Sequence, residues 1–181
     1  MDFYIVFAGV IEQIFANRLV SAINSAGANP LVKKITIIFS SLGGNIQEGF
    51  TIASVIQNSN IPICIHANNN IDSIANVIYL SAKERTAESY AKFYMHGAAT
   101  PPAAYDEKGL KEQMLALKTE NARIAQFVSE NSGLNYKKVQ AMMRAGTTFT
   151  AQQGLQHGIV HAIIHKEVPA GALKEEILAV N

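Results

Sequence analysis

Two side chains of this sequence have the chemistry of nucleophilic catalysis, and each stands at a predicted strand or helix boundary. Ser73 directly precedes an apolar helix predicted over 74–82, so its hydroxyl could project at the end of a sheet. His96 closes a strand predicted over 91–96. A serine hydroxyl is a poor nucleophile until a base, commonly histidine, takes its proton. Taken alone, Ser73 or its neighbour Asp72 is more often a helix N-cap, and His96 a polar residue at a strand end.

A glycine pair provides a second feature with possible chemistry. The β-branched run 34–39 leads to Gly43-Gly44, and helical periodicity resumes from Ile46, with Asn45 as its predicted N-cap. Glycines leave backbone N–H groups bare, so an oxygen anion can approach them closely. By itself such a turn is more often a plain strand-to-helix connection, and its meaning depends on what lies downstream.

The other reactive side chains predict no metal site and no cofactor. His157, His161 and His165 are evenly spaced, but Gly158 breaks any helix that would align them, and no cysteine or carboxylate joins them. The single cysteine, Cys64, lies in an apolar run, which is typical of a small buried hydrophobe in a reducing compartment rather than of a disulfide framework.

Composition narrows the class of protein. The 181 residues are 49% apolar, enough for one domain with a buried core. A net charge of +1 and only 16% charged residues give no basic face for nucleic acid, and the low charge suggests that part of the surface is buried against other copies. No signal peptide and no run of membrane-spanning length is found, so we expect a cytoplasmic protein without a membrane partner.

The elements that must position these residues alternate between strand and helix. We predict strands over 3–8, 34–39, 61–67, 91–96 and 159–164, and helices over 11–26, 46–56, 74–82, 106–131, 135–145 and 151–157, with a further helix in the tail from Pro169. Such alternation indicates a mostly parallel sheet wound with helices, an α/β fold. The helix over 106–131 is long enough to project beyond the core, and its apolar stripe then needs another subunit as partner.

These pieces together resemble the proteolytic subunit of the Clp protease, the ClpP family of serine peptidases. The resemblance runs from about Phe7 to Ile164 and rests on the order of short motifs: Phe7-Ala8-Gly9-Val10-Ile11, Ser41-Leu42-Gly43-Gly44, Ser73, Met95-His96, Phe149-Thr150-Ala151 and Gly158-Ile159-Val160. It implies a crotonase-like α/β fold. It also implies one domain over 1–181, with its core at about 3–165, a handle helix at about 106–131 that joins two rings, and a tail over 166–181.

The resemblance also implies roles for individual residues. Ser73 becomes the nucleophile, His96 its general base, and the N–H groups of Gly44 and Ile74 the oxyanion hole. The substrate would be a peptide or unfolded polypeptide, added as an extended strand near 61–67 inside a homo-oligomeric ring.

Three departures from the family pattern modify this expectation. The acidic third member of the triad falls on or near Met143, so we expect slow hydrolysis by a Ser-His pair, faster for esters than for amides. Asp72 places a carboxylate beside Ser73, where it could repel an oxyanion or raise the pKa of a nearby histidine. Because the sequence begins almost at its first predicted strand, we expect the family's axial N-terminal segment to be missing, which puts an unfoldase ATPase partner in doubt.

Two other classes of function remain open at this stage. A catalytically inactive homologue could keep the fold as an assembly or regulatory subunit. More weakly, the same fold could perform acyl-CoA chemistry, because crotonase-like proteins place a backbone oxyanion hole under a thioester. Fold analogy does not separate these possibilities, whereas covalent labelling of Ser73 would.

Overall fold

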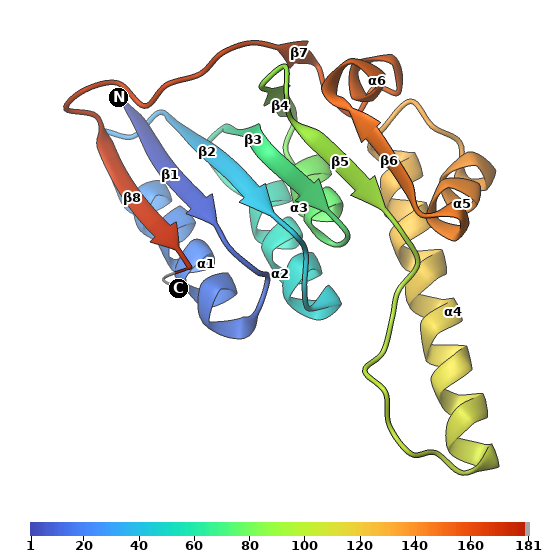
Figure 1. The fold of residues 1–181 in the computed structure, drawn as a ribbon. Coiled ribbons are helices and arrows are strands. Elements are labelled where there is room, and N and C mark those ends of the chain that lie inside the picture. The colour runs from blue at the N-terminus through green and yellow to red at the C-terminus, as the bar shows by residue number, and fades with distance from the viewer. Residues whose placement is uncertain (180–181) are drawn as a thin grey trace.

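The computed structural model describes residues 1–179, which form eight strands and six helices (Figure 1). The strands are β1 (Asp2–Ala8), β2 (Lys34–Ser41), β3 (Ile63–Asp72), β4 (Glu84–Ala87), β5 (Lys92–Met95), β6 (Thr147–Thr150), β7 (Ala162–Ile163) and β8 (Leu173–Leu178). The helices are α1 (Gln13–Ala28), α2 (Ile46–Gln57), α3 (Ala75–Ser81), α4 (Glu107–Glu130), α5 (Tyr136–Ala145) and α6 (Ala151–Gln156).

One twisted sheet organises the molecule. Its strands follow the order β6-β5-β3-β2-β1-β8, with β4 beside the first half of β3 and β7 beside β4. All pairs are parallel except β5 with β6. Helices α1, α2 and α3 cover one face of the sheet (Figure 1). The predicted α/β fold is confirmed, and the parallel strands bring their carboxyl ends, with the turns that follow, to one edge.

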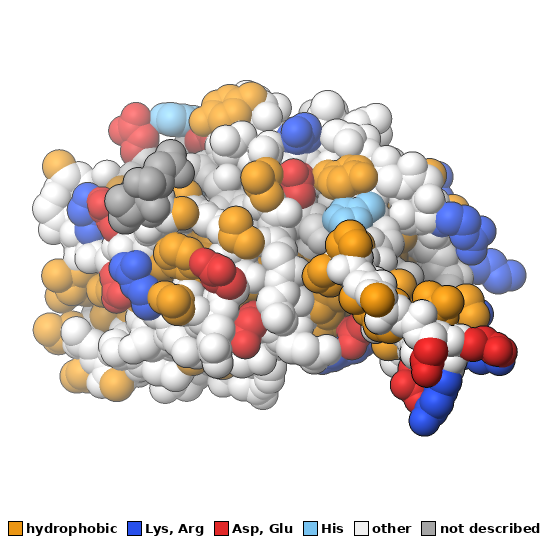
Figure 2. All heavy atoms as spheres, turned by 60° about the horizontal axis from the view of Figure 1, so that its bottom comes forward, with side chains coloured by type: hydrophobic (Ala, Val, Ile, Leu, Met, Phe, Trp, Pro, Cys, Tyr) orange, Lys and Arg blue, Asp and Glu red, His pale blue; other side chains and the backbone are white. Residues whose placement is uncertain are grey.

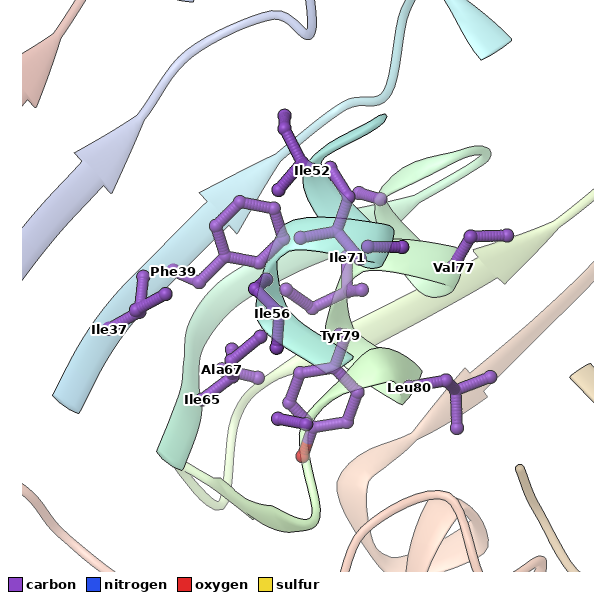
Figure 3. Close-up of a cluster of buried hydrophobic side chains, with 14 of the residues drawn as sticks. Ile37, Phe39, Ile52, Ile56, Ile65, Ala67, Ile71, Val77, Tyr79 and Leu80 are labelled. Atoms are coloured by element: carbon purple, nitrogen blue, oxygen red, sulfur yellow. The ribbon is translucent and has the colours of Figure 1, made fainter. Parts of the chain in front are cut away.

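The core lies between the sheet and these helices. Figure 3 shows side chains from β2 and β3 meeting those from α2 and α3, among them Phe39, Ile52 and Tyr79, all fully buried. Burying one large apolar side chain stabilises a fold by about 1.5–3 kcal/mol. The Tyr79 hydroxyl avoids an unpaired buried polar group by donating to the Thr86 carbonyl at 3.0 Å. This core therefore fixes β3, β2 and α3 against each other.

Strand β3 extends further than the sequence predicts. The strand predicted over 61–67 runs to Asp72, because residues 70–72 find a new neighbour in β5, whose Phe93 pairs with Ile71. Along the same stretch the register with β2 shifts between Phe39 and Ser41. The irregularity lies next to the glycine turn and brings the carboxyl end of β3 beside it.

The tail prediction is wrong. Instead of a helix from Pro169, the chain forms β8, which pairs in parallel with β1 at the edge of the sheet and buries Ile177 completely. The segment contains good helix formers, but the open edge of β1 offers a row of unpaired N–H and C=O groups that only a strand can satisfy. Strands β4 and β6 were not predicted, and the strand predicted over 159–164 shrinks to the two residues of β7.

Helix α4 is as long as predicted and leaves the body of the molecule (Figure 1). Asp106 caps its start by accepting the Gly109 N–H at 2.7 Å. Only its second half is anchored, through buried Ala125 and Val128. Within residues 1–179, none of the helices combines the length and hydropathy needed to span a bilayer.

A buried polar cluster anchors the segment that leads to β8. One oxygen of Glu88, Oε1, lies 3.2 Å from His66 Nε2 and 3.0 Å from His165 Nδ1, and it accepts the Lys166 N–H at 3.0 Å. The other ring nitrogen of His66 lies 2.8 Å from the Thr86 hydroxyl. Burial lowers the pKa of His66 despite the nearby Glu88 carboxylate, which itself has a lowered pKa because hydrogen bonds outweigh its burial. The ring is therefore neutral and donates to Glu88.

The neutral His66 predicts a loss of stability on acidification. The unfolded chain binds a proton at this histidine below about pH 6.5, whereas the folded chain resists it, so the free energy of unfolding should fall with pH below that value. In His66→Gln the slope between pH 6 and 5 should be smaller by up to about 1.4 kcal/mol per pH unit. Urea unfolding at several pH values measures this slope, with His157→Gln as the control. His165, whose pKa is raised by Glu167 and Glu88, acts in the opposite direction in both proteins. Equal slopes in wild type and His66→Gln would contradict the assignment.

Candidate active site

The turn between β3 and α3 holds Ser73 in a strained conformation. Ser73 has φ of 58°, and it is the one non-glycine residue among those described with a positive φ. Such a conformation costs about 1–3 kcal/mol and persists only where its surroundings impose it. The simpler alternative, an N-cap role for Asp72 or Ser73, is wrong, because the N-cap of α3 is Ile74 and it makes no side-chain cap. Ser73 instead stands in a sharp, strained strand-to-helix turn.

Asn76 holds this turn in place. The Ser73 N–H donates to the Tyr94 carbonyl at 2.8 Å, and the Asn76 side-chain amide donates to the carbonyls of Ile71 (3.1 Å), Ser73 (3.1 Å) and Tyr94 (2.9 Å). Asn76 is only 2% exposed. Three carbonyls around one group require the NH₂ end of the amide there, so its orientation follows from chemistry. One buried side chain thus ties β3, the turn and the end of β5 together.

The glycine turn lies directly against Ser73. A Cβ atom at Gly43, where φ is 94°, would lie 2.5 Å from the Ser73 Cβ. At Gly44, with φ of 145°, it would lie 2.2 Å from the Ile11 carbonyl oxygen. Both positions therefore require glycine for two reasons: the backbone has a positive φ, and there is no room for a Cβ atom. Further along, a Cβ at Gly49 of α2 would meet Ile74 Cγ1 at 2.2 Å, so the two strand-to-helix turns are packed closely side by side.

Both N–H groups expected to form an oxyanion hole are free. Within residues 1–179 neither the Gly44 N–H nor the Ile74 N–H donates a hydrogen bond. The Gly44 N–H has no backbone partner because Ile11 bonds to the residues before and after Gly44. The Ile11 N–H donates to the Gly43 carbonyl (2.8 Å), and the Ile11 carbonyl accepts the Asn45 N–H (2.6 Å). Free donors beside a serine are the arrangement that stabilises a tetrahedral oxyanion.

A pocket of about 570 Å³ gathers most of the predicted residues. Gly44, Ser73, His96 and Met143 all line it, together with Asn45, Ile46, Gln47, Asn76, Met95, Ala98, Ala99, Pro101, Glu120, Ile124 and Val128. The Ile74 side chain is buried, so only its backbone is relevant. The pocket wall combines the ends of β-strands with α4. Nothing in the sequence alone predicts that these two parts of the chain lie side by side.

The backbone carbonyl of the next residue, Gly97, orients the His96 ring. Its Nδ1 lies 2.7 Å from the Gly97 carbonyl oxygen, which can only accept, so Nδ1 carries the proton and Nε2 has a free lone pair. The ring also stacks on Tyr94, with centroids 5.0 Å apart. No hydrogen bond joins Ser73 to His96 in the described chain. In enzymes without substrate such contacts are often longer than in the reacting complex.

Asp72 lies outside the pocket lining but close enough to affect the histidine. Burial raises the pKa of its carboxyl, and the charges of Lys92 and His96 oppose that rise. Its Oδ1 is buried without a hydrogen-bond partner. Asp72 pairs with Tyr94 across the β3–β5 ladder. Asp72 therefore lies beside β5, the strand that leads to His96, and outside the residues that line the pocket.

Two of the other histidines contact neighbouring side chains. His165 contacts Glu88 and Glu167, as described above, while His157 lies against the Phe149 ring. Within residues 1–179 no group of three or more His, Cys, Asp or Glu side chains is arranged to hold a metal ion.

Comparisons with known proteins agree on one family. A family model described as Clp protease matches residues 1–167. The ATP-dependent Clp protease proteolytic subunit 2 of Rhodococcus jostii is 24% identical over 172 residues, covering 92% of this chain and 87% of that protein. The subunit of the same name from Mycolicibacterium paratuberculosis is 28% identical over 166 residues, covering 88% of this chain and 81% of that protein. A mutant ClpP1 structure from Listeria monocytogenes superposes with a TM-score of 0.77 at 22% identity, covering 90% of this chain and 91% of that one.

The role of Asn76 predicts a large effect from a small substitution. Asn76→Asp puts an oxygen where three carbonyl oxygens converge, so it should lower the free energy of unfolding by roughly 2–3 kcal/mol or more. Denaturant unfolding measures the loss. Asn69→Asp, the same change at an exposed position of β3, should shift stability by less than about 0.5 kcal/mol. Similar effects at both positions would show that Asn76 does not hold the turn.

Proposed function

The chain belongs to the Clp protease family, and we propose that it is a serine-type peptidase with Ser73 as nucleophile and His96 as general base. The observation that carries the proposal is the turn at Ser73, which is held at positive φ against Gly43 in a pocket that His96 also lines. Backbone strain is expected where a reactive side chain must be presented. A purely structural serine would have no need of it.

The reaction follows from these positions. His96 Nε2 takes the hydroxyl proton as Ser73 Oγ attacks the carbonyl carbon of the substrate. The carbonyl oxygen becomes an anion that the Gly44 and Ile74 N–H groups stabilise. When the tetrahedral intermediate collapses, Nε2 returns the proton to the leaving amine, and water then hydrolyses the acyl-serine by the same steps.

The Gly97 carbonyl performs part of the work of the missing acid. In a complete triad the acid both fixes the tautomer of the histidine and stabilises the imidazolium. The Gly97 carbonyl fixes the tautomer, but it is a neutral dipole, and Met143 supplies no charge. Neutralising a triad acid lowers turnover by about 10⁴, or roughly 5.5 kcal/mol of barrier. We therefore expect slow hydrolysis, with esters well ahead of amides because a better leaving group needs less acid assistance.

Covalent labelling tests the proposal. A fluorophosphonate should add once to the folded protein, as seen by intact mass, and the adduct should be absent in Ser73→Ala. Ser81→Ala, which changes a buried serine in α3 away from the pocket, should be labelled like wild type if it folds. No adduct after prolonged incubation of folded wild type would refute the peptidase.

The neutral residue Met143, at the position of the triad acid, leads to a second test of the mechanism. Met143→Asp should raise ester hydrolysis if its carboxylate reaches His96, since it adds the charge that Gly97 cannot provide. The rate is compared in wild type, Met143→Asp and Met143→Asp with Ser73→Ala, with circular dichroism as a check on folding. A gain that survives loss of Ser73 would show that the chemistry is not that of the serine.

Two observations favour a second candidate, a non-catalytic subunit. Among the described residues Ser73 and His96 share no hydrogen bond, and the triad acid is replaced. Such a chain would keep the fold for assembly with other copies. A folded protein that assembles but never reacts with a fluorophosphonate is the result expected from this alternative.

The exposed part of α4 supports assembly in either case. Its first half carries Leu110, Met114 and Leu115, which are 58%, 52% and 65% exposed. Figure 2 shows hydrophobic side chains gathered around this projecting part of the molecule, with charges at its tip. Exposed apolar side chains concentrated on one helix are expected at an interface. We propose that α4 contacts another copy within a homo-oligomeric ring assembly.

Assembly through α4 is tested by charge substitution. Leu110→Glu with Met114→Glu should lower the mass measured by light scattering, because two carboxylates would be buried against the partner. Ala116→Glu, an exposed position on the side of the helix away from all three residues, is the control and should not. Phe127 is unsuitable for this test, because its ring packs on Phe50 within the subunit. A monodisperse wild-type monomer at micromolar concentration would contradict the proposal.

A further inference from the structure

The carbonyl that orients His96 belongs to a peptide unit that is held at both ends. This unit, the 97/98 peptide, joins Gly97 to Ala98. Its carbonyl oxygen lies 2.7 Å from His96 Nδ1, and its N–H, that of Ala98, donates to Asn121 Oδ1 at 2.7 Å. The carbonyl and the N–H of a trans peptide are fixed in one plane and point in opposite directions. A chain of hydrogen bonds therefore runs from the imidazole, through the peptide, to the Asn121 side chain.

Asn121 provides a firm support for this peptide. It lies in the anchored half of α4, one turn before the fully buried Ala125. Its oxygen must face Ala98, because the NH₂ end of the amide can only donate. Gly97 allows the close approach, since a Cβ atom at that position would lie 3.3 Å from Asn121 Oδ1. Asn121 is not among the residues that line the pocket, so any effect on His96 passes through the peptide.

We propose that Asn121 is a positioning residue for His96. It fixes the 97/98 peptide so that the Gly97 carbonyl keeps the proton on Nδ1 and leaves the Nε2 lone pair free for Ser73. An acceptor at the N–H end of a peptide polarises its carbonyl, which then binds an imidazolium more strongly. Without that acceptor the peptide could turn about the permissive Gly97, and the ring would lose its partner. The proposal rests on the proposed function in one respect, namely that His96 acts as the base for Ser73.

Two substitutions at this position should change the rate in opposite directions. Asn121→Ala removes the acceptor and should lower kcat for a peptide ester about threefold to tenfold, the scale of one hydrogen bond. Asn121→Asp keeps an acceptor and adds a negative charge, which strengthens the chain of hydrogen bonds when the imidazolium forms, so kcat should rise about threefold or more. KM should change little in either variant, because Asn121 lies outside the pocket lining.

Asn135→Asp is the matched control for the added charge. Asn135 is the N-cap of α5, where its side chain accepts the Lys138 N–H, and aspartate caps a helix as well as asparagine does. The variant therefore carries the same substitution, keeps its fold and has no contact with the 97/98 peptide. Its kcat should equal that of wild type.

The tautomer of His96 is measured separately from catalysis, in the inactive Ser73→Ala protein. Histidine is labelled with ¹⁵N, and solid-state NMR at mildly alkaline pH distinguishes protonated from unprotonated ring nitrogens whatever the size of the assembly. The His96 signals are assigned by their loss in His96→Gln. With Asn121 present, Nδ1 should be protonated and Nε2 unprotonated. Asn121→Ala should add a second population with the proton on Nε2, whereas Asn121→Asp should keep the single tautomer.

The results separate this proposal from that of the peptidase. A His96 tautomer that is unchanged in Asn121→Ala would overturn the positioning role. So would an Asn121→Asp protein that is folded by circular dichroism but no faster than wild type, or an equal gain in Asn135→Asp. If wild type neither hydrolyses esters nor reacts with a fluorophosphonate, the role of Ser73 fails, and the NMR result still decides whether Asn121 sets the tautomer of His96.

Discussion

The site depends on one constraint, the left-handed conformation of Ser73 and the hydrogen bonds that impose it. The Asn76 amide donates to carbonyls at the end of β3, in the turn and at the end of β5, and so ties all three together. The glycine turn is a consequence of the same constraint, because a side chain at Gly43 would occupy the space of Ser73. The strain is tolerated because the surrounding core, with Phe39 and Tyr79 fully buried, is rigid.

In the proposed mechanism His96 keeps one of the two contributions that a triad acid would make. A backbone carbonyl one residue away fixes the tautomer of His96, so the loss of the acid at Met143 removes charge stabilisation and not orientation. Asp72 adds negative charge near the same strand but from outside the pocket. The chemistry that we propose is therefore suited to reactive acyl groups.

The sequence predicts the parts of this structure that periodicity and glycine control. The alternation of strands and helices, the turn at Gly43 and the length of α4 are all visible as patterns. Asn76 could not be predicted, because a single polar residue in an apolar helix has no signature until three carbonyls surround it. Nor could the Gly97 carbonyl, since every residue has one. The strand β8 was missed because local helix propensity was outweighed by the open edge of β1.

The most direct test of the central claim is a crystal structure of the protein after reaction with a phosphonate ester. The account predicts phosphorus bonded to Ser73 Oγ, with its oxygen within about 3.1 Å of the Gly44 and Ile74 N–H groups. His96 Nε2 should face the same centre while Nδ1 stays on the Gly97 carbonyl. A phosphoryl oxygen directed away from both N–H groups, or phosphorus attached to another residue, would contradict the account.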